Sequence, residues 1–275
     1  MDASVVFSRC AEAGGLPALR ELGNLAAVRV YQKAGSCNES ARGARTLSML
    51  PAHVLRWLDH NAGDECSAYL QYIVDEYDRL PSSVFFLQYA AEHQLMLPSV
   101  AATVRAAVGP LRHLGFVALS RHSFEGKWPA PCEAGGKQAT FARCSEAIFR
   151  DLGVAIPGRI RFYANGLFAV SRDRVRSRPL GFYQAMLHRL SGRATARCDG
   201  PDTRRRAGAS SRLVGDCHVL EKAWHIVFQE PPELPPPHEY NQVRAMTNRT
   251  LRIGGRFYET SPGGKCAVGN PPTRI

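Results

Sequence analysis

The sequence predicts an α/β fold, a three-layer sandwich with a mostly parallel central sheet. Strand-like and helix-like segments alternate along its first half. A helix-like segment at 64–78 leads into the continuous apolar run at 84–87, which is typical of a central strand covered on both faces. With 275 residues, 45% of them hydrophobic, the chain can bury one sizeable core. We therefore expect a single α/β domain over residues 1–230.

The N-terminal elements follow from composition and hydrophobic period. Residues 5–8 are β-branched and aromatic, and residues 27–32 alternate between apolar and polar, so both segments are expected to be strands. Between them, leucines at near-helical spacing predict a short helix at 16–23. In 64–78 the apolar residues recur every three or four positions, which predicts a helix that Pro81 ends. This order of strand, helix and strand favours parallel pairing.

The same patterns continue through the rest of the chain. Helical spacing of apolar residues predicts helices at 99–114, 142–152, 172–190 and 217–228. Apolar runs predict strands at 116–119, 159–164 and 166–171. Pro179 is expected to break the third of these helices near its start.

Several segments lack a hydrophobic period. Residues 122–140 are rich in Gly, Pro and charge, and are expected to form a long loop over the surface or the mouth of the site. Residues 191–212, dense in Gly, Arg, Ser and Asp, predict a flexible insertion. A Pro-rich C-terminal extension is expected at 231–275, with a hairpin at 250–259 around a Gly-Gly pair.

The chain is strongly basic. Its formal net charge is +11, its sequence pI is about 9.5, and arginine supplies most of the basic residues. A guanidinium binds phosphate or carboxylate as a planar fork, so a nucleotide-sugar or another anionic small molecule is one expected partner. A solvated basic face and a nucleic acid partner are the alternatives, because net charge bears on association rather than on fold.

Cysteines and hydropathy bound the class of protein. Eight cysteines are scattered without a Cys-x-x-Cys pair, so neither a zinc ribbon nor a redox motif is predicted. Most are expected to be small buried residues, and disulfides, for example at Cys37 or Cys132, stay open. No segment reaches the roughly 20 apolar residues of a membrane span, and the N-terminal apolar run is too short for a signal peptide. We expect a soluble chain, with a missing upstream segment left open.

Common catalytic motifs are absent from the sequence. It has no Gly-rich phosphate loop with Lys, no G-x-G-x-x-G after a strand and no G-x-S-x-G elbow. No Asp-x-Asp pair follows a buried strand, which is the arrangement that holds a divalent cation on a diphosphate. We therefore predict no cofactor and no metal-binding residues.

Polar residues near the ends of the predicted strands form the candidate site. Glu65 lies in the first turn of a helix that Asn61 can cap, where an acid also offsets the helix dipole. Gln88 and His93 follow the central apolar strand, so their side chains are expected at the carboxyl edge of the sheet. Glu12, which follows the first strand, completes this group.

A second set of candidates comes from the helix expected at 217–228. Glu221 and Trp224 on this helix place a carboxylate beside an aromatic wall, which suits a general base. A surface acid and a core aromatic are the structural alternatives. Arg9 and Arg172, each at the end of a predicted strand, are candidates for holding a diphosphate.

Residues 61–88 resemble a known family. They are similar to N-x-G-R-E-x-x-x-Y-L-x-x-I-x-x-x-Y-x-x-L-P-x-x-x-x-F-x-Q, the hallmark of the family called domain of unknown function 3431. The matching residues are Asn61, Gly63, Glu65, Tyr69, Leu70, Ile73, Tyr77, Leu80, Pro81, Phe86 and Gln88. The blocks at 166–178 and 218–228 also resemble this family, so the similarity spans roughly residues 4–230. Asp64 stands where the family usually has arginine, and residues 89–93 replace its commoner turn.

The order of these blocks is also similar to that of nucleotide-sugar glycosyltransferases with the GT-A type of fold. This resemblance implies a nucleotide-diphospho-sugar transferase-like fold and a glycosyltransferase-like transferase of unknown donor and acceptor, in which Glu221 deprotonates the acceptor. Without Asp-x-Asp, such an enzyme would be metal-independent or use an unusual ligand set. Two alternatives stay open, an RNA-dependent acyl transferase and a non-catalytic binding protein with a degenerate transferase cleft.

Overall fold

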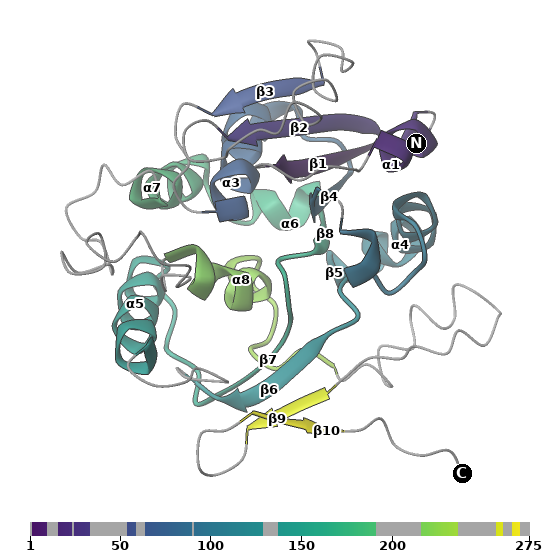
Figure 1. Cartoon of the computed structure of the whole chain (residues 1–275). Coiled ribbons are helices and arrows are strands. Elements are labelled where there is room, and N and C mark those ends of the chain that lie inside the picture. Colours follow the sequence, from purple (N-terminus) through teal and green to yellow (C-terminus); the bar gives the residue numbers. More distant parts are fainter. Residues whose placement is uncertain are drawn as a thin grey trace.

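The computed structural model confirms the α/β class. It describes residues 2–9, 16–23, 25–33, 54–58, 64–89, 91–128, 137–190, 216–235, 257–260 and 266–269. Within these ranges a six-stranded, mostly parallel sheet carries helices on both faces (Figure 1). A second, four-stranded sheet lies below the first in this view.

The central sheet has the order β3-β2-β1-β4-β8-β5. Its strands are β1 (Ala3–Arg9), β2 (Ala27–Lys33), β3 (Leu55–Leu58), β4 (Ser83–Gln88), β5 (Phe116–Ala118) and β8 (Phe168–Ser171). The first four strands in this order are parallel, and β8 is antiparallel to both of its neighbours, β4 and β5. The chain reverses its direction of travel across the sheet between β1 and β4. In open α/β sheets this point, outside the carboxyl ends of the strands, is where ligands bind.

Helices cover the two faces of this sheet (Figure 1). On one face, α1 (Leu16–Leu22) packs against α4 (Val100–Leu114), which begins at the capping residue Ser99 and ends at Gly115 with a positive φ of 77°. On the other face, α3 (Asp64–Glu76) packs on β1 and contacts α7 (Leu180–Leu190) and α8 (Asp216–Val227).

The predicted helix at 172–190 is two helices. Ser171 caps the short α6 (Arg172–Arg176), and Pro179 separates it from α7. The two short 3₁₀ segments of the described chain are η1 (Tyr77–Arg79), which extends α3 toward Pro81, and η2 (Glu92–Gln94), which follows β4.

The second sheet corrects two sequence-based predictions. It has the order β10-β9-β6-β7, built from β6 (Ser123–Lys127), β7 (Arg159–Tyr163), β9 (Phe257–Thr260) and β10 (Cys266–Gly269), and α5 (Lys137–Asp151) lies between β6 and β7 in the chain. The predicted loop at 122–140 therefore begins with a strand, which pairs with β7. The C-terminal hairpin joins β9 to β10, further along than the 250–259 predicted.

Parts of the C-terminal half lie outside the described residues. Arg161 donates its backbone N–H to Pro232 and accepts one from Leu234, so 232–234 run alongside β7. The predicted insertion at 191–212 lies outside the described residues. In the described ranges, no helix is both long and apolar enough to cross a membrane.

An aromatic cluster forms the core between the central sheet and the α3 and α8 helices. The ring of Tyr69 lies 5.0 Å from that of Phe86 on β4 and 5.9 Å from that of Phe168 on β8. Trp224 on α8 contacts both Tyr69 and Phe168, at 6.0 and 5.3 Å between ring centroids. The packing of this cluster fixes the position and rotation of α3 and α8 on the sheet. It therefore also determines where the polar residues of these helices lie at the sheet edge.

Candidate functional site

The register of α3 on the sheet places Glu65 at the carboxyl edge. Phe86 and Phe168 face each other across β4 and β8, and Tyr69 packs over both. Glu65 precedes Tyr69 by four residues, which is about 6 Å along the helix. Two residues of a strand span nearly the same length, about 6.6 Å. Because α3 runs antiparallel to β4, Glu65 is expected near the residue two positions after Phe86 on β4. On the antiparallel strand β8 the same level is reached two positions before Phe168.

These residues are Gln88 and Gly166. The pairing of β4 with β8 ends at Phe86↔Phe168, so Gln88, the last residue of β4, and Gly166, in the turn before β8, both lie beyond it at the carboxyl end of β4. The position that a Cβ atom would take at Gly166 lies 3.4 Å from Glu65 Oε1 and 3.5 Å from Trp224 Nε1. Glu65, Gly166 and Trp224 therefore converge at the end of the sheet at which Gln88 ends β4.

Glu221, on α8, contacts the turn that carries Gly166. Its Oε1 accepts a 2.8 Å hydrogen bond from the backbone N–H of Asn165, and its Oε2 lies 3.8 Å from His218 Nδ1. Asn165 and Gly166 both have positive φ, 68° and 55°. Few non-glycine residues adopt that conformation, so the bond to Glu221 helps to hold the turn that brings Gly166 against Glu65.

A disulfide links the helices that carry the two carboxylates. Cys66 and Cys217, each the residue after an acidic one near the start of its helix, are bonded with a Cα–Cα distance of 5.6 Å. Glu65 is adjacent to Cys66, and Glu221 lies one helical turn after Cys217. Glu65, Cys66 and Cys217 also form a group of possible metal ligands within 4.8 Å of one another. The bonded sulfurs do not offer thiolates to a metal, so this group is a disulfide with a neighbouring carboxylate.

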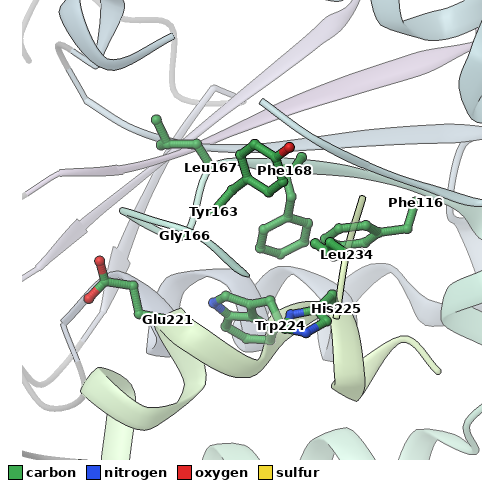
Figure 2. Close-up of a pocket in the computed structure, with 10 residues that line it drawn as sticks. Phe116, Tyr163, Gly166, Leu167, Phe168, Glu221, Trp224, His225 and Leu234 are labelled. Carbon is green, nitrogen blue, oxygen red and sulfur yellow. The ribbon is translucent and has the colours of Figure 1, made fainter. Parts of the chain in front are cut away.

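A small pocket borders these residues (Figure 2). It is lined by Phe116, Ala118, Tyr163, Gly166, Leu167, Phe168, Glu221, Trp224, His225 and Leu234. The centre of a water molecule can occupy about 10 Å³ of it, which is room for about one water. The pocket is far too small for a nucleotide-sugar, so any such ligand would bind outside it, along the sheet edge.

A family model for proteins of unknown function, DUF3431, matches residues 51–243, more than half of the chain. The chain belongs to the DUF3431 family. This match confirms the resemblance seen in the block around Glu65 and Gln88.

Among solved structures, this DUF3431 protein is similar to mannose-1-phosphate geranyltransferase from Thermus thermophilus. The two share 14% sequence identity with a TM-score of 0.34, over 97% of this chain and 75% of the other. A likeness this weak carries no argument about what the DUF3431 protein binds. A comparison with curated proteins found no match.

Arg9 lies at the same edge as Glu65 but on the opposite face of the sheet. Phe86 faces α3, and successive strand residues alternate between faces, so Tyr89 points toward the other face. The Arg9 guanidinium lies 5.4 Å from the centroid of the Tyr89 ring. Arg9 is fully buried and donates a hydrogen bond to Gln32, so in the DUF3431 fold it is part of the core at the switch point.

The structure does not bring Arg172 to this edge. Arg172 follows β8, and because β8 is antiparallel, Ser171 pairs with Ser83 at the amino end of β4. The length of β4, about 20 Å at 3.3 Å per residue, separates the two edges. The expectation that Arg9 and Arg172 hold one diphosphate is therefore wrong, since the direction of β8 places them at opposite ends of the sheet.

The remaining predicted site residues are not part of the group around Glu65 and Gly166. His93 is exposed on η2, within 3.3 Å of Gln94, and does not line the pocket. Glu12 and Asn61 lie outside the described residues. Lys33 was not among the residues predicted from the sequence; it is 6% exposed at the end of β2. Lys33 points to the α3 face because Tyr31, two residues earlier, contacts Asp75 of α3.

His225 is a buried histidine next to Trp224. It is 2% exposed, and its Nε2 lies 3.0 Å from the carbonyl oxygen of Pro232. Burial disfavours the imidazolium and lowers the pKa of His225 to about 4, although the Pro232 carbonyl partly opposes this shift. At neutral pH the uncharged ring donates its Nε2–H to Pro232 and ties α8 to the segment alongside β7.

We expect His225 to make the protein less stable in acid. Between about pH 6.5 and pH 4 the unfolded chain binds a proton at this position and the folded chain does not, so the free energy of unfolding falls by up to about 3 kcal/mol as the pH is lowered. A His225→Gln variant should lose less stability over the same range. Urea denaturation of both proteins across this window measures the difference, and equal losses would contradict the assignment.

Proposed function

We propose that this protein is a glycosyltransferase-like enzyme that transfers a group from an anionic nucleotide-sugar donor to a hydroxyl acceptor. The observation that carries the proposal is the meeting of two carboxylates, Glu65 from α3 and Glu221 from α8, around the open turn at Gly166. This meeting occurs at the carboxyl edge of an α/β sheet, beside its switch point. The similarity of the sequence blocks to GT-A enzymes gives the proposal its donor class.

In the proposed reaction, Glu65 takes the proton of the acceptor hydroxyl. The acceptor oxygen then forms a bond to the anomeric carbon of the donor. The bond from that carbon to the diphosphate oxygen breaks, and the nucleoside diphosphate leaves with the electron pair. General base catalysis of this kind needs a carboxylate within hydrogen-bond reach of the hydroxyl.

Glu221 has a different role in this proposal from the one inferred from sequence. Its Oε1 is engaged by the Asn165 N–H, which shapes the turn under Glu65. Glu65 borders Gly166 together with the indole N–H of Trp224, so we assign the proton transfer to Glu65 and make Glu221 a positioning residue. A glutamine at 221 still offers an oxygen to Asn165, whereas a glutamine at 65 does not accept the acceptor's proton.

Lys33 is the candidate for the donor's diphosphate. It is the basic residue at the end of β2 on the face that carries Glu65, whereas Arg9 lies on the other face. β2 is two strands from β4, about 10 Å at the spacing of neighbouring strands. A donor lying along the edge could therefore have its diphosphate near Lys33 and its sugar near Gln88 and Glu65.

A thermal-shift panel of nucleotides, sugar nucleotides, divalent cations and RNA tests the donor class. A ligand that binds only the folded protein at 100 times its Kd adds about 2.7 kcal/mol, which raises Tm by roughly 5–10 °C. We expect a nucleoside diphosphate-sugar to give the largest shift, and Lys33→Ala to remove it. Stabilisation by RNA alone, with a steep salt dependence, would instead favour the RNA-dependent acyl transferase.

A further inference from the structure

We infer that the place between Glu65 and Trp224, beside Gly166, is a binding site for a single oxygen atom, occupied by water in the free protein and by the acceptor hydroxyl during transfer. Only the identity of the acceptor hydroxyl rests on the proposed function; the bound water does not. Glu65 supplies the hydrogen-bond acceptor of this site, and the indole N–H of Trp224 supplies a donor.

The geometry at Gly166 places the oxygen. The absent Cβ position is 3.4 Å from Glu65 Oε1 and 3.5 Å from Trp224 Nε1. Both polar atoms border the same point above Gly166, so an oxygen lying between them, farther from the backbone than the Cβ position, would reach both at ordinary hydrogen-bond distances. Figure 2 shows the indole nitrogen of Trp224 on the side of the ring that faces Glu221 and Gly166.

Two buried donors call for such an oxygen. The Nε1 of Trp224 and the hydroxyl of Tyr69 are both buried, and among the described residues neither has a hydrogen-bond partner. A buried donor without a partner is costly, so native proteins supply one, often as an ordered water. Tyr69 lies one turn after Glu65, and its pKa is raised by burial and by the charges of Glu65 and Glu221, so its hydroxyl stays protonated and able to donate.

The chemistry of the site matches a hydroxyl group. A hydroxyl donates one hydrogen bond and accepts others, so it can donate to Glu65 while it accepts from Trp224. When its proton passes to Glu65, the negative charge that grows on the oxygen is stabilised by the neighbouring N–H and O–H donors, as in an oxyanion hole. A phosphate or carboxylate is excluded, because Glu65 and Glu221 would repel it.

Paired glycine substitutions test the site. Gly166→Ala would put a methyl group between the backbone and the oxygen, in a residue with φ of 55°; Gly153→Ala places an alanine at a similar φ, 62°, with nothing within 4 Å. The two changes therefore share the backbone cost and differ in the space filled. We expect Gly166→Ala to lower Tm by several degrees more than Gly153→Ala. Equal shifts would overturn the inference.

Removal of the Tyr69 hydroxyl is an independent test, because the direction of the change in Tm depends on whether an oxygen is bound. If an oxygen is bound, Tyr69→Phe removes a hydrogen bond and should lower Tm by a few degrees, as we also expect of Tyr72→Phe, which removes the bond to Ser4. If the space is dry, Tyr69→Phe removes an unsatisfied group and leaves Tm unchanged or raises it, which would overturn the inference.

Transfer assays separate the site from the proposed function. With a donor identified by thermal shift, Gly166→Ala should reduce transfer at least about 100-fold, and Gly153→Ala should leave it near wild type. If the Tm shifts are as expected but the wild type transfers no sugar, the oxygen site stands and the glycosyl-transfer proposal falls. Retained transfer in Gly166→Ala would overturn the acceptor role of the site.

Discussion

Replacing Glu65 with glutamine is expected to reduce the rate of group transfer by about 10²–10⁴-fold, the usual contribution of a general base. The glutamine side chain has the size and shape of glutamate but does not take up the acceptor's proton. Because Glu65 is at the edge of the sheet and not in the aromatic core, the fold should be retained. The rate is measured as release of nucleoside diphosphate from the donor that the thermal-shift panel identifies.

Two further variants make this result specific. Glu221→Gln keeps an oxygen for the Asn165 N–H, so it should lose only a few-fold in rate, whereas Glu221→Ala should lose much more because the turn under Glu65 is released. Glu76→Gln makes the same chemical change at the far end of α3, where Glu76 pairs with Arg79, and should have little effect. A large loss in Glu221→Gln together with a normal rate in Glu65→Gln would reverse the two roles.

Removal of the Cys66–Cys217 disulfide should give the largest loss of stability. The bond closes a loop of 151 residues, for which the chain-entropy model gives about 5 kcal/mol, and measured values for natural disulfides are about 2–5 kcal/mol. For a domain of this size, a loss of that order lowers Tm by roughly 10 °C or more. Thermal unfolding of the Cys66→Ala/Cys217→Ala double variant measures the change.

The free cysteine provides the control. Cys144 is buried on α5 without a disulfide, so Cys144→Ala measures the cost of removing a buried thiol alone. The double variant should also lose transfer activity, because the disulfide holds together the starts of the helices that carry Glu65 and Glu221. Free thiols at both positions in the native protein, or a Tm change no larger than that of Cys144→Ala, would contradict the structural role of the bond.

The elements of the central sheet could be predicted where one residue pattern dominates. The spacing of Tyr69 and Ile73 indicated α3, the apolar run at 84–87 indicated β4, and the aromatic contacts between them followed from that order. These same residues set the register that carries Glu65 to the carboxyl end of β4. This part of the candidate site was therefore accessible from sequence, because it depends on a helix and a strand that are adjacent in the chain.

Other parts of the site depend on contacts between distant segments. The direction of β8 is set by the chain between β5 and β8, in which Ser123–Lys127 lacks an apolar alternation and did not indicate a strand; hence Arg172 was assigned to the wrong edge. The disulfide joins two of eight cysteines, which allow about a hundred complete pairings, and no spacing favours this one. The turn at Asn165 is held by a carboxylate 56 residues away.

A high-resolution crystal structure of the protein without ligand tests the central claim most directly. We expect an ordered water beside Gly166, about 2.7–3.2 Å from both a Glu65 carboxylate oxygen and Trp224 Nε1, with Glu221 bonded to the Asn165 N–H. A Glu65 side chain turned away from Gly166, with the space over that glycine empty or filled by a side chain, would contradict the oxygen site and, with it, the proposed transfer chemistry.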